Sequence, residues 1–155
     1  MSEAWVHTRA ERPELRGPAG GPARILARAK ETGGAITVVE NVVGPGQGPP
    51  KHLHEAEDEL FYVMSGHLHV HAGDDVLEAP PGSLVFIPRQ MPHVFQNTAA
   101  EPASLLVLFT PAGMEGFFEG VAALDAGVAL ADAAHELGKS VGMQVLGPPL
   151  PPPPD

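Results

Sequence analysis

The chain has 155 residues, enough for one domain with its own hydrophobic core, and it contains no cysteine, which excludes disulfides, thiolate metal ligands and cysteine nucleophiles. Nine Lys and Arg against nineteen Asp and Glu give a formal charge of -10, which would repel a phosphate backbone, so we expect no nucleic-acid partner. The start of the chain lacks the pattern of a secretory signal, and its longest apolar runs, such as 105–109, are too short to cross a bilayer. We therefore expect a cytoplasmic protein with no membrane-spanning segment.

The first third of the chain changes character twice. Residues 1–22 are polar, contain several Gly and Pro, and show no sustained period, so we interpret them as a flexible arm or an edge strand. The β-branched and other apolar residues at 25–26 and 35–43 indicate strands, with Gly33 and Gly34 between them. A loop rich in Gly and Pro follows at 44–50.

The middle of the chain is a series of short segments separated by turn residues, and we expect strands at 51–54, 59–64, 67–71, 84–87, 93–97 and 105–109. Strands so short and so numerous are typical of a jelly roll or barrel, which makes the fold class all-β. After residue 111 the apolar spacing becomes helical, and it predicts two short helices over one end of the barrel, at 114–121 and 128–137.

The last segment, 147–155, is nearly all proline and indicates a polyproline-like or disordered tail, to which we assign no function. The predicted organisation is an N-terminal arm or edge strand at 1–22, a barrel at 23–111, a helical cover at 112–146 and the tail at 147–155.

The strongest chemical signal is the pair His52 and His54. Two positions apart on a strand, both rings project from the same face and can bind one ion, while Leu53 points the other way. Imidazole and carboxylate ligands suit Fe, Ni, Mn, Co, Cu or Zn, and three or four of them leave positions open for substrate or oxygen. An isolated His-x-His pair is nevertheless more often a chance feature of the surface than a metal site. The residues around the pair therefore decide between these two interpretations.

The pattern around these histidines resembles the first motif of the cupin superfamily: Gly46, five residues, His52-Leu-His54, four residues, Glu59, six residues, Gly66. A second motif follows at the expected spacing: Gly82, five residues, Pro88, then His93, three residues, Asn97. The resemblance covers about residues 35–110. It implies a double-stranded β-helix, the cupin jelly-roll barrel, with one divalent metal ion held by His52, His54, Glu59 and His93.

The motifs depart from the family at Gln90, where glycine is usual two residues after the proline. If that turn needs a positive φ, Gln90 carries a cost of about 1 kcal/mol. Glu57 and Asp58 are rival carboxylates that spacing alone cannot exclude, and the family frame favours Glu59 as the ligand.

Residues on the ligand-bearing strand faces are candidates for the substrate pocket. Alternation from Glu59 and from His93 selects Phe61, Val63, Phe95 and Asn97, either as pocket lining or as plain barrel core. Tyr62 falls on the opposite face and is interpreted as structural.

The other histidines are interpreted as lying outside the site. His67, His69 and His71 alternate with Leu68 and Val70, so the two apolar residues belong to the core and the histidines face solvent or a subunit contact. His7 and His135 are isolated and are interpreted as surface residues.

The wider pattern, including 110–118 and 145–149, resembles small single-domain cupins of the quercetin-dioxygenase-like type. In such enzymes the ion binds an enolic or phenolic small-molecule substrate and dioxygen, and the glutamate accepts the hydroxyl proton, so the resemblance implies that Glu59 is both ligand and catalytic base. Two alternatives stay open: a metal-dependent isomerase, cyclase, lyase or dehydratase that uses the ion as a Lewis acid, and a non-enzymatic cupin that binds a small ligand.

We also expect a homodimer, because related barrels commonly pair and residues 36–43 offer apolar edge strands.

Overall fold

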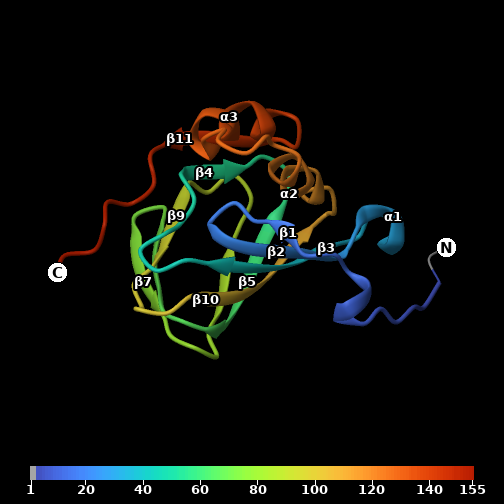
Figure 1. Cartoon of the computed structure of the whole chain (residues 1–155), viewed down its shortest axis with the longest axis horizontal. Helices are drawn as coiled ribbons and strands as arrows, with labels where there is room; N and C mark the ends of the chain where they lie inside the picture. The colour runs from blue at the N-terminus through green and yellow to red at the C-terminus, as the bar shows by residue number, and fades with distance from the viewer. Residues whose placement is uncertain (1–2) are drawn as a thin grey trace.

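The computed structural model describes residues 3–155, so the first two residues of the expected N-terminal arm lie outside the described residues. The strands form two antiparallel sheets that face each other as a flattened barrel, with the two C-terminal helices gathered at one end (Figure 1). The predicted all-β jelly roll with short C-terminal helices is confirmed.

Each sheet combines strands from distant parts of the sequence. The six-stranded sheet has the order β1 (Leu15–Arg16), β2 (Gly20–Ala27), β3 (Thr37–Val43), β10 (Ala103–Thr110), β5 (Asp58–Ser65) and β8 (Leu84–Ile87). The five-stranded sheet has the order β11 (Met143–Gly147), β4 (Lys51–His54), β9 (His93–Asn97), β6 (Leu68–Ala72) and β7 (Asp75–Ala79). The helices are the 3-10 turn η1 (Arg9–Glu11), α1 (Ala29–Thr32), α2 (Glu115–Ala122) and α3 (Leu130–Lys139).

The hydrophobic core lies between the two sheets. β3 and β10 alternate strictly between buried and half-buried residues, which is the pattern of strands with one face toward a core. The fully buried aliphatic and aromatic side chains of this core include Ile25, Val39, Val43, Phe61, Val63, Leu68, Val70, Ile87 and Leu105. Each such side chain contributes roughly 1.5–3 kcal/mol relative to an exposed position, so the packed sheets give the site a rigid frame.

The expectation that residues 36–43 form an edge strand is wrong. β3 pairs with β2 on one side and with β10 on the other, so its backbone groups are already satisfied within the sheet. The ends of this sheet are β1 and β8 instead.

The segment after α3 returns to the barrel. β11 pairs antiparallel with β4, the strand of His52 and His54, so the C-terminal region both covers the barrel and extends one of its sheets. The proline tail then leaves along the barrel, where the carbonyl of Pro148 accepts from the backbone N–H of Lys51 and that of Pro151 accepts from the side chain of Gln96.

The turn before β9 holds Gln90 at a φ of 69°, the left-handed conformation that the missing motif glycine implied. The backbone N–H of Gln90 donates to the carbonyl of His54 over 2.8 Å, and its side-chain amide donates to the carbonyl of Glu55 over 2.6 Å. The turn is thereby attached to the end of β4.

Candidate metal centre

β4 brings the two histidines of the His-x-His pair to the inside of the barrel. His52 and His54 are 6% and 3% exposed, while Leu53 between them is half-buried on the other face, as the alternation predicts. β4 pairs with β9 so that His52 stands directly opposite His93. Three imidazoles therefore come from two neighbouring strands of the five-stranded sheet.

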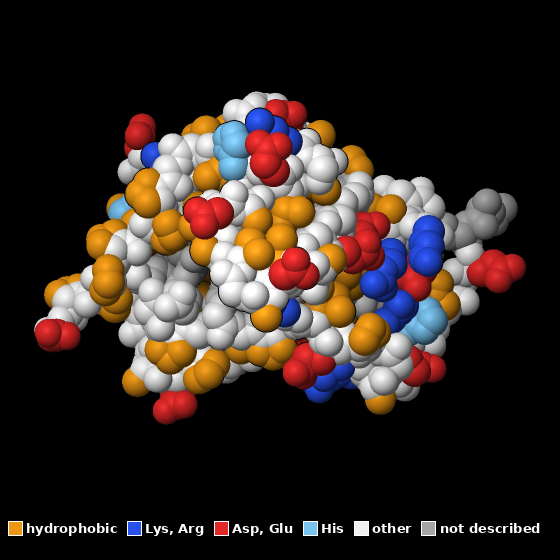
Figure 2. All heavy atoms as spheres, turned by 45° about the horizontal axis from the view of Figure 1, so that its top comes forward, with side chains coloured by type: hydrophobic (Ala, Val, Ile, Leu, Met, Phe, Trp, Pro, Cys, Tyr) orange, Lys and Arg blue, Asp and Glu red, His pale blue; other side chains and the backbone are white. Residues whose placement is uncertain are grey.

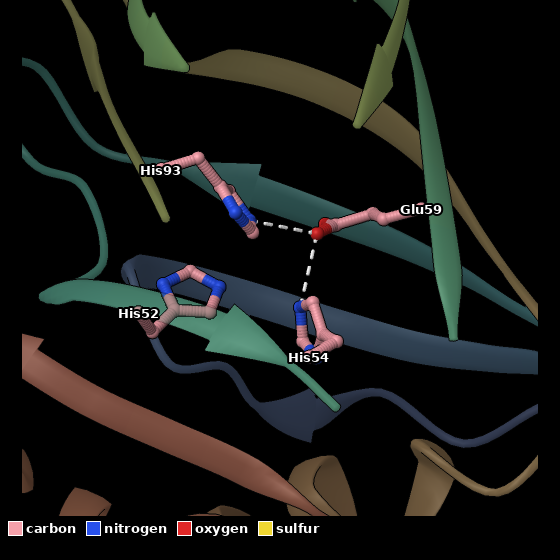
Figure 3. Close-up of side chains that lie close together, drawn as sticks. All are labelled: His52, His54, Glu59 and His93. Carbon is pink, nitrogen blue, oxygen red and sulfur yellow. Dashed lines mark hydrogen bonds and ion pairs between the residues drawn. The ribbon is translucent and has the colours of Figure 1, made fainter. Parts of the chain in front are cut away.

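Glu59 reaches the same point from the opposite sheet, on β5. Its Oε2 atom lies 3.0 Å from His54 Nε2 and 3.0 Å from His93 Nε2 (Figure 3). One candidate ligand atom from each of the four residues lies within 4.8 Å of all the others, and all four residues are buried. The structure thus gathers the four residues singled out by the family motifs, from three strands and both sheets.

Two of the rings are oriented by backbone carbonyls. His52 Nδ1 donates to the carbonyl of Pro50 over 2.7 Å, and His93 Nδ1 donates to the carbonyl of Met91 over 2.9 Å. A carbonyl only accepts, so each Nδ1 carries the hydrogen and, in the neutral ring, leaves the lone pair on Nε2. This is the orientation that a metal-binding histidine requires, and it shows that the donor set fits a divalent ion.

Protonation follows from burial and from the neighbours. Burial, together with the nearby His93 and His54, lowers the pKa of His52 to about 3, so its ring is neutral. Burial opposes ionisation of Glu59, but hydrogen bonds from His54 and His93 outweigh it and hold the pKa of that carboxyl well below its usual range. For His93, burial opposes protonation while the bond to Glu59 raises the pKa of the ring. An ion bound here would take the place of that proton.

The rival carboxylates lie apart from this group. Asp58 forms an ion pair with Arg89, at 3.1 Å, on the side of the turn that faces solvent. Glu57 is buried, and burial raises the pKa of its carboxyl, but it is not among the four converging residues. The structure therefore favours Glu59 over both, as the family frame does.

A cavity of about 60 Å³ lies next to His52, His54 and Glu59. Its remaining wall is mostly aromatic and aliphatic, and includes Phe95, Val107, Phe109, Met114, Phe117 and Phe118. Of the four residues that alternation proposed for the pocket, Phe95 lines this cavity. Phe61 and Val63 are completely buried in the core below it, and Phe61 packs against Phe95 with ring centroids 5.2 Å apart.

Asn97, the fourth of those residues, has a structural role. Its side-chain amide donates to the carbonyls of Val43 and Glu101, and its oxygen accepts from the backbone N–H of Ala99. These bonds fix the end of β9, and Asn97 is absent from the cavity lining within the described chain.

The cavity wall contains one asparagine that sequence reasoning did not select. Asn41 projects from the inner face of β3, is 4% exposed, and its Oδ1 has no hydrogen-bond partner among residues 3–155. The only signal in the sequence is a polar residue at an inward position of an otherwise apolar strand. A buried acceptor without a partner is costly, so this oxygen is available to a ligand.

A wider groove of about 830 Å³ adjoins the cavity at the surface. Both are lined by Pro18, Pro50, Leu130 and Ala134, so the β1–β2 hairpin, the loop before β4 and α3 together surround the entrance. Figure 2 looks toward this end of the molecule, where most of the visible Lys and Arg side chains gather near the N-terminal segment. Apart from Glu14 and Arg16, the residues that line the groove are apolar or neutral.

The cupin domain model matches residues 40–109, the stretch that contains His52, His54, Glu59 and His93. This barrel belongs to the cupin superfamily. A segment of 56 residues is also 32% identical to the uncharacterized protein SCO3923 of Streptomyces coelicolor and covers 36% of this chain and 52% of that protein. The matched segment thus spans about half the length of this curated relative.

Solved structures share the fold at low sequence identity. An RmlC-like cupin from Shewanella frigidimarina has a TM-score of 0.62 at 17% identity and covers 73% of this chain and 96% of its own. The polyketide cyclase RemF from Streptomyces resistomycificus has a TM-score of 0.58 at 24% identity, covering 70% and 80%. A predicted oxalate decarboxylase from Thermotoga maritima has a TM-score of 0.59 at 19% identity, covering 69% and 99%. These likenesses establish the cupin fold and leave the reaction open.

In the part of the chain that the structure describes, no helix combines the length and the apolar character needed to cross a membrane.

Proposed function

We propose that this cupin is a metal-dependent enzyme of the quercetin-dioxygenase-like kind, which oxidises an enolic or phenolic small molecule with dioxygen. The observation that carries the proposal is the position of the four donors. Three imidazoles and one carboxylate converge beside an aromatic cavity that adjoins a groove at the surface. Structural metal sites are closed by their ligands, whereas a site beside a cavity has room for a substrate.

His52, His54, Glu59 and His93 would hold one ion of Fe, Ni, Mn, Co, Cu or Zn. Such an ion supplies a Lewis acid and open positions beside the cavity. The chain itself contributes the orientation of the rings, through the carbonyls of Pro50 and Met91.

Glu59 would act as the base. The carboxylate is ionised, and an ion bound to His54 and His93 would replace the hydrogen bonds that lower its pKa, so that it could accept a proton. The substrate O–H bond breaks, an O–H bond forms on the carboxylate, and an electron-rich enolate or phenolate remains. The aromatic wall keeps water away from this anion and offers flat surfaces to a planar ligand.

Asn41 would orient the substrate. Its Oδ1 has no partner within the described residues, so it can accept a hydrogen bond from a second hydroxyl of the bound molecule. The small volume of the cavity means that only the reacting end of a larger substrate fits beside the ligands, with the rest in the outer groove.

The test is product formation with and without oxygen in a screen of enolic and phenolic compounds. We expect turnover to stop without oxygen, and Glu59→Gln to lose far more rate than binding because an amide cannot take the proton. Glu57→Gln is the matched control: Glu57 is a buried neighbouring carboxylate with a raised pKa, outside the converging group. Full anaerobic activity of the wild type would contradict the oxidative proposal.

A second candidate is a non-redox cyclase or isomerase that uses the same enolate. One observation favours it: a structural relative at 24% identity is described as a polyketide cyclase. This candidate keeps the proton transfer to Glu59 and predicts turnover without oxygen. Tight, metal-dependent ligand binding without any turnover would favour a binding protein instead.

A further inference from the structure

A second histidine group lies on the outer face of the five-stranded sheet, away from the metal centre. His67, His69 and His71 project outward near or along β6, while Leu68 and Val70 are buried, as predicted. β7 places Glu78 directly opposite His69. The side chains of His67 and His69 are 38% and 31% exposed, so ions in solution can reach them.

Glu78 fixes the proton positions in this group. One carboxylate oxygen lies 2.5 Å from His69 Nδ1 and the other lies 2.7 Å from His67 Nε2. Hydrogen bonds from His69 and His67 hold the pKa of Glu78 below its usual value, so the carboxylate is an acceptor. His69 Nδ1 must therefore carry the hydrogen, and the lone pair of the neutral ring is on Nε2.

That lone pair faces a second ring nitrogen. His69 Nε2 and His71 Nε2 are 3.0 Å apart, and the ring planes are inclined by 67°. Two nitrogens bound to one ion at about 2.0–2.1 Å, with an N–metal–N angle between 90° and the tetrahedral value, lie about 2.8–3.4 Å apart. The observed separation falls within this range, so both nitrogens can bind one ion with little movement.

We propose that His69 and His71 form a second binding site, for an exchangeable divalent transition ion, with Glu78 as the positioning residue of His69. Glu78, His69 and the ion would make the carboxylate–histidine–metal arrangement that fixes the tautomer and strengthens the ligand. Without the ion, His71 Nε2–H donates to the lone pair of His69 Nε2. On binding, His71 Nε2 releases that proton to solvent and Nδ1 of the same ring takes one up, so that both Nε2 lone pairs face the ion.

The site differs from the buried centre in strength and selectivity. Only two protein ligands are present, both rings are partly exposed, and water completes the coordination, so the ion exchanges readily. Imidazole ligands favour Cu²⁺, Ni²⁺ and Zn²⁺, whereas Mg²⁺ prefers oxygen and should not compete. The sequence predicted that these histidines face outward, but alternation does not show that two ring nitrogens converge.

The experiment is equilibrium dialysis of the full chain against excess Zn²⁺, followed by elemental analysis. Wild type should bind about one zinc ion more per chain than His69→Gln/His71→Gln. Any ion in the buried centre contributes equally to both proteins, because both retain that centre, so it does not affect the difference. Glu78→Gln should keep the second ion but weaken its binding roughly 10–100-fold. His67→Gln is the matched control, because His67 also contacts Glu78 but is not a proposed ligand, and its affinity should be unchanged.

Equal zinc content in wild type and the double variant would overturn the proposal. Circular dichroism checks that each variant is folded, and if the double variant is not, the affinities of Glu78→Gln and His67→Gln decide. A loss of affinity in His67→Gln as large as in Glu78→Gln would show that Glu78 does not act through His69. Addition of Mg²⁺ in place of Zn²⁺ should give no difference between the proteins, and a difference would contradict an imidazole site.

Discussion

The side-chain amide of Gln90 donates a 2.6 Å hydrogen bond to the backbone carbonyl of Glu55, one residue beyond the candidate metal ligand His54. The same residue has a φ of 69°, so a non-glycine side chain occupies a left-handed turn. The departure from the family motif thus has a structural consequence: the side chain that strains the turn also ties it to the end of β4.

Gln90→Ala and Gln90→Gly separate these two effects. Alanine keeps the left-handed strain and loses the amide bond, so it should lower the free energy of unfolding by about 1 kcal/mol. Glycine loses the same bond but relieves the strain, so it should be more stable than alanine by about 1 kcal/mol. Urea unfolding of both variants measures the difference. An alanine variant as stable as the glycine variant would show that the turn is not strained.

The ligand assignment predicts the metal content of the purified protein. His52→Ala/His54→Ala should lose the tightly bound ion, because it removes two of the four converging donors. His135→Ala, which changes an exposed histidine on α3, should keep it. Elemental analysis after dialysis measures both, and a double variant that retains its ion would refute the assignment.

Much of the barrel could be predicted because its strands carry their own local signals. β4, β8 and β9 begin and end at the predicted residues, since turn residues bound each of them. β7 was missed because Val76 and Leu77 are both exposed and do not alternate. β11 was missed because its pairing with β4 depends on a distant segment, which no local pattern contains.

The site could be predicted only in part, for a similar reason. Alternation states which face of a strand a residue occupies, but not its depth along the barrel. Phe61 and Phe95 both point inward, yet Phe95 reaches the cavity and Phe61 lies in the core beneath it. Phe109 lines the cavity from β10, where it pairs with Glu59, whereas Phe117 reaches it only because α2 folds back over the barrel, which is a long-range feature.

The low pKa of His52 predicts how the metal-free protein responds to acid. The folded ring stays neutral down to a pH of about 3, whereas the unfolded ring takes a proton near its reference pKa of about 6.5. The unfolded state therefore binds more protons between these values, and this residue makes stability fall as the pH falls through that window. His93 acts in the opposite direction, because Glu59 raises its pKa and stabilises its charged form.

Replacing His52 by Gln isolates its contribution. The metal-free His52→Gln variant should lose less stability than wild type between a pH of about 6.5 and about 3, as measured by urea unfolding at a series of pH values. Parallel pH curves for the two proteins would show that His52 is not neutral in the fold.

Metal occupancy should also fall with pH, because the histidines that bind the ion become protonated. A metal occupancy that does not change with acid would argue against imidazole ligands.

The homodimer stays a prediction, and the structure points to a different surface for it. The outer face of β10, β5 and β8 carries a continuous set of apolar side chains: Leu60, Tyr62, Met64, Leu84, Phe86, Leu106 and Leu108. Tyr62 pairs with Leu84 across two strands, and Phe86 and Leu84 are 56% and 62% exposed. A patch of this kind is typical of a protein interface, and a two-fold contact would cover it in both copies.

Light scattering with Phe86→Glu tests this surface. The variant should be monomeric at concentrations at which the wild type is dimeric, because a charge in an apolar contact is left unpaired. Val76→Glu, an exposed apolar position on the other sheet, should not change the mass. A wild type that is monomeric at high concentration would end the dimer prediction.

Asn41→Leu should make the protein more stable and a weaker binder of its substrate. Asn41 Oδ1 is buried without a partner in the described chain, and leucine has a similar size without the unsatisfied acceptor. The free energy of unfolding should therefore rise by about 1 kcal/mol. If the oxygen accepts a substrate hydroxyl, its loss should raise KM roughly tenfold or more while kcat changes little.

Asn97→Leu is the matched control: its amide is bonded to Val43 and Glu101, so the same substitution should destabilise the fold. An Asn41→Leu variant that loses stability and keeps its KM would show that Asn41 supports the strand rather than the substrate.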